Sequence, residues 1–75
     1  MKWKLEEWVY PIRDKYRQIV KLGRWKLVPA VDDEKTALDW VADARAKGLV
    51  RRARGPDGVE AWGYPHSFYI IRPRQ

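Results

Sequence analysis

The sequence predicts an α+β fold, in which an antiparallel sheet of four to five strands carries one helix packed on one face. Two observations lead to this class. One amphipathic helix pattern covers residues 32–48, and short segments rich in aromatic and β-branched residues, separated by turn residues, lie on both sides of it. A helix with a single apolar stripe must pack on another element, which these segments supply as a sheet. The expected order is ββαββ with a further strand at the end, in one domain over residues 1–75.

The helix prediction rests on both ends and both sides of the segment. Asp32 is a favoured N-cap residue, and Gly48 stands where a left-handed glycine commonly ends a helix. At about 100° per residue, the apolar side chains share one arc: Ala37, Leu38, Trp40, Val41 and Ala44. Oppositely charged residues at i,i+4 spacing form two pairs on the other side: Lys35 with Asp39, and Asp43 with Lys47.

The segment before the helix predicts a hairpin. Its parts are a strand at residues 3–10, a loop at residues 11–15 and a second strand at residues 16–22. A helix across residues 2–10 competes with the first strand, but three aromatic residues in that stretch favour the strand. Residues 25–28 then extend the second strand or form a short third one, and Pro29 is expected to end it.

The segment after the helix predicts three short strands. They lie at residues 49–54, 59–64 and 67–72. Gly55-Pro56-Asp57-Gly58 is a strong turn signal between the first two, because proline fixes φ and Asp-Gly suits a tight turn. Pro65-His66 separates the last two strands. This part of the chain therefore completes the sheet on which the helix packs.

The composition excludes several classes of protein. The 75 residues include no cysteine, so there is neither a disulfide nor a thiolate that could bind metal or act as a nucleophile. No apolar run approaches the roughly 18 residues that a membrane span requires, and the N-terminus lacks the apolar region of a signal peptide. We therefore expect a small cytoplasmic protein that does not enter a membrane.

The charge is unevenly distributed along the chain. Residues 1–31 carry eight Lys or Arg and three acids, a net charge of +5. The helix segment, residues 32–48, carries three Lys or Arg and five acids, a net charge of −2. Residues 49–75 carry five Lys or Arg and two acids, a net charge of +3. The helix is thus acidic, and the segments that form the sheet are basic.

Few residues in the chain suit catalysis. The single histidine and single serine, His66 and Ser67, are adjacent, so on a strand they would point to opposite faces and could not act as base and nucleophile. The acids of the helix match no calcium-binding spacing and are explained by capping and i,i+4 pairs. We expect no enzyme activity, no metal and no cofactor.

One enzymatic alternative stays open, a metal-free ribonuclease that holds and protonates a phosphodiester on a basic sheet. Its residue types occur together near the C-terminus: His66, Tyr69, Arg72 and Arg74. No motif supports this alternative, and we rank it third.

The most informative pattern is the alternation of basic and aromatic residues on the expected strands. If the helix covers one face of the sheet, the other face presents cations among rings, which can bind phosphates and stack on bases. We expect the contacts to come from seven residues: Lys4, Trp8, Arg17, Lys21, Arg24, Arg52 and Arg54. The first interpretation is therefore a small basic protein that binds DNA or RNA through this face.

Two other interpretations use the same residues. Trp, Tyr and Arg are also the residues that dominate protein interfaces, so the second interpretation is a regulator or inhibitor of an acidic or nucleic-acid-binding protein. Under either of these two binding interpretations, we expect an accessory protein of a virus or mobile element. A further interpretation, set against both binding functions, is that the aromatic residues fill the core and the basic residues only keep the protein in solution. An unpaired edge strand would also favour a homodimer.

Overall fold

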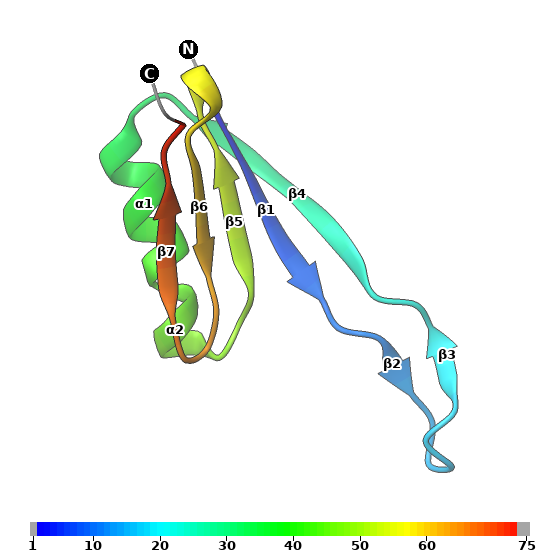
Figure 1. Cartoon of the computed structure of the whole chain (residues 1–75). Coiled ribbons are helices and arrows are strands. Elements are labelled where there is room, and N and C mark those ends of the chain that lie inside the picture. The colour runs from blue at the N-terminus through cyan, green and yellow to red at the C-terminus, as the bar shows by residue number, and fades with distance from the viewer. Residues whose placement is uncertain (1, 74–75) are drawn as a thin grey trace.

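The computed structural model describes residues 2–73 and confirms the predicted α+β class (Figure 1). A five-stranded antiparallel sheet has the strand order β4-β1-β5-β6-β7. Its strands are β1 (Trp3–Val9), β4 (Arg24–Val31), β5 (Arg51–Arg54), β6 (Glu60–Gly63) and β7 (Phe68–Ile71). Two short strands, β2 (Ile12–Arg13) and β3 (Ile19–Lys21), form a separate pair. No helix within residues 2–73 has the length and apolar character to cross a membrane.

The predicted helix is present but is divided into α1 (Glu34–Ala42) and α2 (Ala44–Lys47). Asp33, not Asp32, caps its start. The Asp33 carboxylate accepts hydrogen bonds from the backbone N–H and the hydroxyl of Thr36, at 2.9 and 2.8 Å. Gly48 follows α2 at φ 66°, the left-handed conformation that the sequence predicted for the end of this segment.

The core is a thin layer between the helix and the sheet. Its buried apolar side chains are those of Trp3, Leu5, Ala37, Val41, Ala44, Ala53 and Ala61. The strands under α1 carry small residues, which lets the helix lie close to the backbone of the sheet. Gly63 on β6 is the extreme case, because a Cβ there would collide with the carbonyl oxygen of Val41. The apolar arc predicted for the helix is thus confirmed as the packing surface.

The partner of β1 differs from the sequence-based expectation. We expected residues 16–22 to pair with the first strand, whereas the structure pairs β1 with β4, residues 24–31. β4 also runs through Pro29, which we expected to end a strand. β4 is an edge strand, where a proline is tolerated, and the register shifts by one residue between Trp3 and Leu5, as in a β-bulge.

Residues 10–23 form an arm that projects beyond the part of the sheet that the helix covers (Figure 1). The arm contains β2, β3 and the turn between them, and it makes the molecule elongated, with extents of 49 × 22 × 22 Å. Asp14 organises the turn, since its carboxylate accepts hydrogen bonds from the backbone N–H groups of Tyr16 and Gln18, at 2.8 and 3.0 Å. Arg17 occupies the left-handed region, at φ 64°. Residues 16–22 are therefore a turn and a short strand rather than one long strand.

Candidate nucleic-acid interface

The sheet face opposite the helix, which we call the open face, carries a continuous row of large side chains. Alternate residues of a strand point to opposite faces, and antiparallel partners point to the same face. The observed pairings therefore align one residue from each strand across the open face: Leu27, Glu6, Arg52, Trp62 and Tyr69. Neither α1 nor α2 lies over this row, because the helix packs on Leu5, Ala53 and Ala61 of the other face.

Arg52 is the centre of the row. Its Nε and Nη2 atoms donate hydrogen bonds to the two carboxylate oxygens of Glu6, at 2.9 and 3.2 Å. The guanidinium carbon lies 4.0 Å from the ring centroid of Trp25 and 5.4 Å from that of Trp62. The hydrogen bond from Arg52 is the main reason why the pKa of Glu6 is lowered. Arg52 is thus neutralised and held between rings, and its side chain is only 15% exposed.

Five aromatic rings on the open face touch one another in sequence. The centroid distances are 5.4 Å for Trp8–Trp25, 5.9 Å for Trp25–Trp62, 6.3 Å for Trp62–Tyr64 and 5.7 Å for Tyr64–Tyr69. Trp62 and Tyr64 are stacked, and the other contacts are edge-on. The other four rings are half-buried, whereas Tyr69 is 52% exposed at the β7 end. This chain of rings crosses the sheet from one edge strand to the other.

The five tryptophans divide between the two faces. Trp8, Trp25 and Trp62 belong to the open face, among Arg52 and the other rings. Trp3 is 4% exposed in the core, and Trp40 of α1 lies against the guanidinium of Arg51. The aromatic residues therefore serve both as core and as a surface that the helix leaves uncovered.

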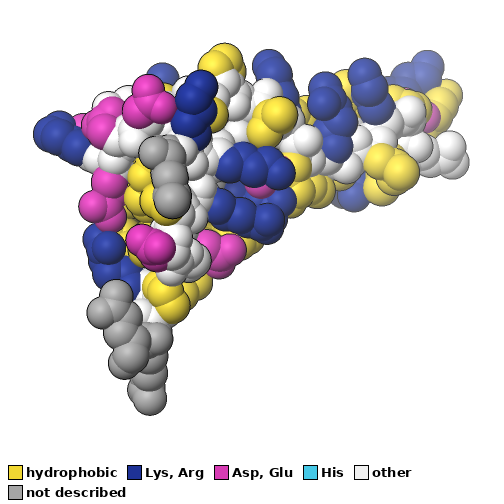
Figure 2. Space-filling view, turned by 90° about the horizontal axis from the view of Figure 1, so that it is seen from above, with side chains coloured by type: hydrophobic (Ala, Val, Ile, Leu, Met, Phe, Trp, Pro, Cys, Tyr) yellow, Lys and Arg dark blue, Asp and Glu magenta, His cyan; other side chains and the backbone are white. Residues whose placement is uncertain are grey.

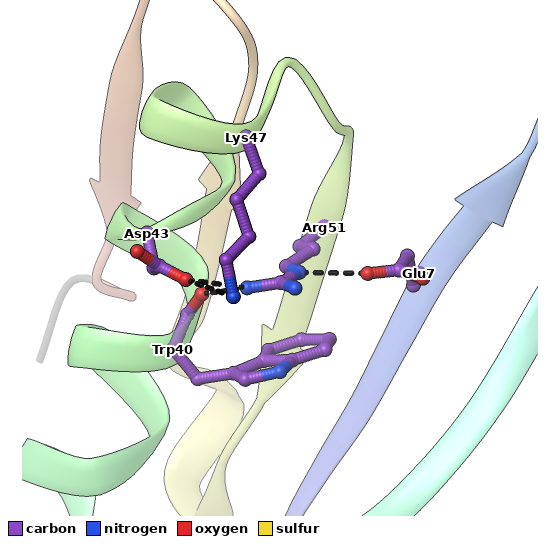
Figure 3. A network of polar contacts seen from close by, with 5 residues as sticks. All are labelled: Glu7, Trp40, Asp43, Lys47 and Arg51. Atoms are coloured by element: carbon purple, nitrogen blue, oxygen red, sulfur yellow. Dashed lines mark hydrogen bonds and ion pairs between the residues drawn. The ribbon is translucent and has the colours of Figure 1, made fainter.

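A second ion-pair network on the helix side is structural (Figure 3). Arg51 on β5 donates from Nε to Glu7 on β1 at 2.8 Å, and from Nη1 to the carbonyl oxygen of Trp40 at 2.9 Å. Asp43, at the break between α1 and α2, lies 3.5 Å from Arg51 and 2.9 Å from Lys47. The network joins two strands to the helix. The sequence analysis singled out only its Asp43–Lys47 pair. The signal for the rest was a Glu and an Arg that each lie two residues from a core residue, Leu5 or Ala53, and therefore on the same face of the sheet.

Four of the seven predicted contact residues come together on the open face. Lys4 is exposed and lies directly opposite Arg54, next to the Glu6–Arg52 pair, and Trp8 begins the chain of rings. Arg54 is 3.5 Å from Glu60 and its side chain remains 46% exposed. The structure thus brings Lys4, Trp8, Arg52 and Arg54 into one surface.

The other three predicted contact residues lie elsewhere. Arg17 and Lys21 are exposed on the arm. Arg24 pairs with Val9 at the base of the arm, on the side that corresponds to the helix face. These three residues therefore extend the basic surface away from the open face rather than adding to it.

A shallow hollow of about 480 Å³ borders the open face at the bulge of β4. Leu27, Val28, Pro29 and Ala30 form its apolar wall, and Lys2 and Lys4 stand beside it. An apolar surface next to two ammonium groups suits a planar ring that carries an anionic group. The hollow is of the size that small-molecule groups occupy in proteins.

Cations without an ion pair are concentrated on one half of the molecule. Among residues 2–73 the recorded salt bridges use the arginines of β5, Arg72 and two helix lysines. The exposed cations of residues 2–26, which comprise Lys2, β1, the arm and the start of β4, take part in none of them: Lys2, Lys4, Arg13, Lys15, Arg17, Lys21, Arg24 and Lys26. Figure 2 shows the basic side chains along the extension of the molecule and most of the acidic ones at the helix end.

The residues considered for a ribonuclease are not gathered into one site. His66 is exposed in the turn before β7 and Arg72 follows the end of β7, so the whole strand, about 15–20 Å, separates them. Arg72 contacts Glu34 at 2.8 Å, and the Tyr69 hydroxyl is hydrogen-bonded to Ser67 at 3.1 Å. Arg74 lies outside the described residues.

Comparisons of the chain with protein families, with curated proteins and with solved structures found no significant match. The functional argument therefore rests on the geometry and charge of this chain.

Proposed function

We propose that this protein binds nucleic acid and catalyses no reaction, using the open face together with the basic half of the molecule formed by β1, the arm and β4. One observation carries the proposal: the cations outside recorded ion pairs are concentrated on that half, while the nearby acids are engaged. Glu6 and Glu7 pair with Arg52 and Arg51, and Asp14 caps a turn. A surface of uncompensated cations attracts a polyanion, and phosphate contacts of this kind supply much of the affinity for nucleic acid.

The aromatic residues of the open face favour nucleic acid over an acidic protein as the partner. Tyr69 presents an exposed ring at one end of the chain of rings, and the hollow beside Lys2 and Lys4 offers an apolar surface with cations at its rim. Bases stack on such rings irrespective of sequence, while the cations bind the flanking phosphates. The proposal is therefore of binding with little sequence preference.

Salt dependence tests the proposal. Fluorescence anisotropy with labelled 20-nucleotide DNA and RNA, single-stranded and duplex, at three salt concentrations should give micromolar affinity at moderate salt. About five phosphate contacts predict a log–log slope near −4, because each contact contributes roughly −0.7 to −0.9. Absence of binding even at low salt would refute the proposal. Recovery of one acidic protein from a nuclease-treated lysate would then support the regulator or inhibitor instead.

Two charge-reversal variants locate the surface. Lys4→Glu on the open face should weaken binding several-fold and reduce the magnitude of the slope by about one contact. Arg45→Glu on the helix changes the net charge by the same amount and is exposed, but it lies away from the open face, so it should have little effect. Equal effects of the two variants would mean that only net charge matters. Arg52→Glu is unsuitable as a probe because Arg52 also holds Glu6 and two rings.

Stacking is tested separately from charge. Tyr69→Ala should reduce affinity for single strands about tenfold with an unchanged salt slope, because stacking releases no counterions. Tyr69→Phe keeps the ring and should bind like the parent protein. If Tyr69→Ala binds as tightly as Tyr69→Phe, the ring of Tyr69 is not part of the interface.

A further inference from the structure

We infer that the arm, residues 10–23, occupies the major groove of duplex DNA. The inference rests on the proposed function and names its substrate. Four observations lead to it: the charge on both sides of the arm, the engagement of its one acid, its two-stranded width and its exposed apolar side chains.

The arm presents cations on both of its faces. In β2 and β3, Ile12 is paired with Lys21 and Arg13 with Ile19, so Lys21 and Arg13 point to opposite sides of the ribbon. Lys15 and Arg17 are exposed in the turn at its tip. The basic charge is therefore not confined to one face, and whichever face turns toward the floor of the groove carries a long basic side chain that can reach a flanking phosphate.

The arm holds four cations and a single acid, Asp14, whose carboxylate is held within the turn. Asp14 accepts hydrogen bonds from the backbone N–H groups of Tyr16 and Gln18, and its own N–H donates to the carbonyl oxygen of Gln18 at 2.9 Å. Its carboxylate thus completes the turn, and the side chain is only half-exposed. Four cations and one acid leave the arm with a net charge of +3.

The dimensions of the arm select the groove. Two paired strands lie about 4.8 Å apart, and a two-stranded ribbon fits the major groove of B-form DNA, which is about 12 Å wide and 8.5 Å deep. The major groove of A-form RNA is too narrow and deep for side chains to read, and its minor groove is shallow. The arm also projects clear of the helix, so no other part of the described chain blocks its approach (Figure 1).

Large apolar side chains of the arm are exposed: Tyr10, Ile12, Tyr16, Ile19, Val20 and Leu22. In the major groove they would contact thymine methyl groups and exclude water beside the charged contacts. A second copy of the arm is a poorer occupant, because pairing two arms would bring like charges together. Charge therefore favours a polyanion over a second arm, and the groove dimensions favour duplex DNA among polyanions.

The decisive experiment compares substrates and maps the groove. With 20-bp DNA, 20-bp RNA and the corresponding single strands at equal salt, duplex DNA should bind at least tenfold more tightly than duplex RNA. Dimethyl sulfate methylates guanine N7 in the major groove and adenine N3 in the minor groove. At saturating protein, N7 should be protected and N3 should stay reactive. Both measurements use the unmodified protein.

A matched pair of variants assigns the effect to the arm. Lys21→Glu should lower duplex DNA affinity about tenfold and single-strand affinity less than twofold, whereas Lys4→Glu should lower both. Circular dichroism should show that both variants stay folded. Equal affinity for DNA and RNA duplexes, or unprotected N7 with salt-dependent binding intact, would overturn the groove inference and leave the proposed function standing. A parent protein that binds no nucleic acid would overturn both.

Discussion

Glu6 is the residue on which the open face depends. It is 8% exposed, and both of its carboxylate oxygens accept hydrogen bonds from Arg52. A buried ion pair is by itself weak evidence of net stabilisation. Removing one partner is costly, however, because the charge of the other partner then stays buried without compensation. The pair therefore fixes the position of Arg52 between Trp25 and Trp62.

Replacement of Glu6 should accordingly destabilise the fold. Glu6→Gln keeps the shape but removes the charge, and we expect a loss of about 2–3 kcal/mol, reduced from the fully buried case because Arg52 keeps some contact with water. For a domain of this size, thermal unfolding should shift down by roughly 10 °C or more. Glu60→Gln is the control, since the Glu60–Arg54 contact is longer, at 3.5 Å, and more exposed. A control that loses as much as Glu6→Gln would contradict this account.

The same residue makes stability depend on pH. Arg52 lowers the pKa of Glu6 in the folded protein, so the unfolded chain binds a proton at this position more readily than the folded one. The stability that the charged Glu6 carboxylate contributes is complete above the pKa of the unfolded chain, near 4.3, and is lost as the pH falls through the lower pKa of the folded protein. Urea unfolding at pH 6, 5, 4 and 3 should show stability falling below about pH 4.5. Asp33 and Asp43 also have lowered pKa values, so they contribute to the same loss of stability at low pH. Stability should fall less steeply with pH in Glu6→Gln than in the parent protein, and the difference is the contribution of Glu6.

At the scale of elements, the helix is secured by one central residue. Val41 is fully buried against the sheet, and its carbonyl oxygen lies over Gly63. Val41→Asp should place a carboxylate without a partner in the core, and a domain with only a few kcal/mol of stability should then lose cooperative unfolding. Differential scanning calorimetry measures this directly. The exposed Ala42→Asp is the control, and a Val41→Asp melt within a few degrees of it would mean that the helix does not dock by this face.

Local signals made most elements predictable from the sequence. The helix, its left-handed end at Gly48 and its i,i+4 pairs depend on neighbouring residues, and the turn at residues 55–58 depends on its own Pro, Asp and Gly. The alternation of residues within each strand also indicated which cations and rings would share a face. These features need no knowledge of distant parts of the chain.

Apart from the cap at Asp33 and the division of the helix at Asp43, the features that the sequence analysis missed are non-local. The pairing of β1 with β4, rather than with the nearer residues 16–22, follows from the Asp14 turn and the bulge near Pro29, which together set the arm apart. Glu6 and Arg52 meet because β1 and β5 are neighbours in the sheet, and no spacing along the chain indicates that. Strand order, and therefore the site that it assembles, depends on tertiary packing.

At the scale of the whole molecule, the two edges of the sheet differ. β4 carries Lys26, Pro29 and a bulge, features that discourage further strand pairing. β7 contains four apolar residues in Phe68–Ile71, each between 37% and 52% exposed, and no charge. We therefore expect weak self-association by antiparallel pairing of two β7 strands.

So short an edge buries less surface than a standard interface, so the association should be weak. Sedimentation velocity from about 5 to 500 μM should therefore show a dimer only at the higher protein concentrations. Ile70→Lys should abolish the dimer. Leu27→Lys makes the same kind of change on β4, where Leu27 is 65% exposed, and should leave the dimer intact. A parent protein that stays monomeric over the whole range would refute pairing through β7.

The position of β1 between β4 and β5 also sets the order in which the chain can fold. β1 is synthesised before the other strands and pairs with β4, where Trp8 lies opposite Trp25. Its other neighbour is β5, where Arg51 lies opposite Glu7, and β5 is synthesised only after the helix. Until then a nascent chain has a two-stranded ribbon, marginal in water, with one open backbone edge and no cover for Trp3 and Leu5. Cooperative folding therefore waits for β5 and β6, and a chain truncated before them offers β1 as a template for aggregation.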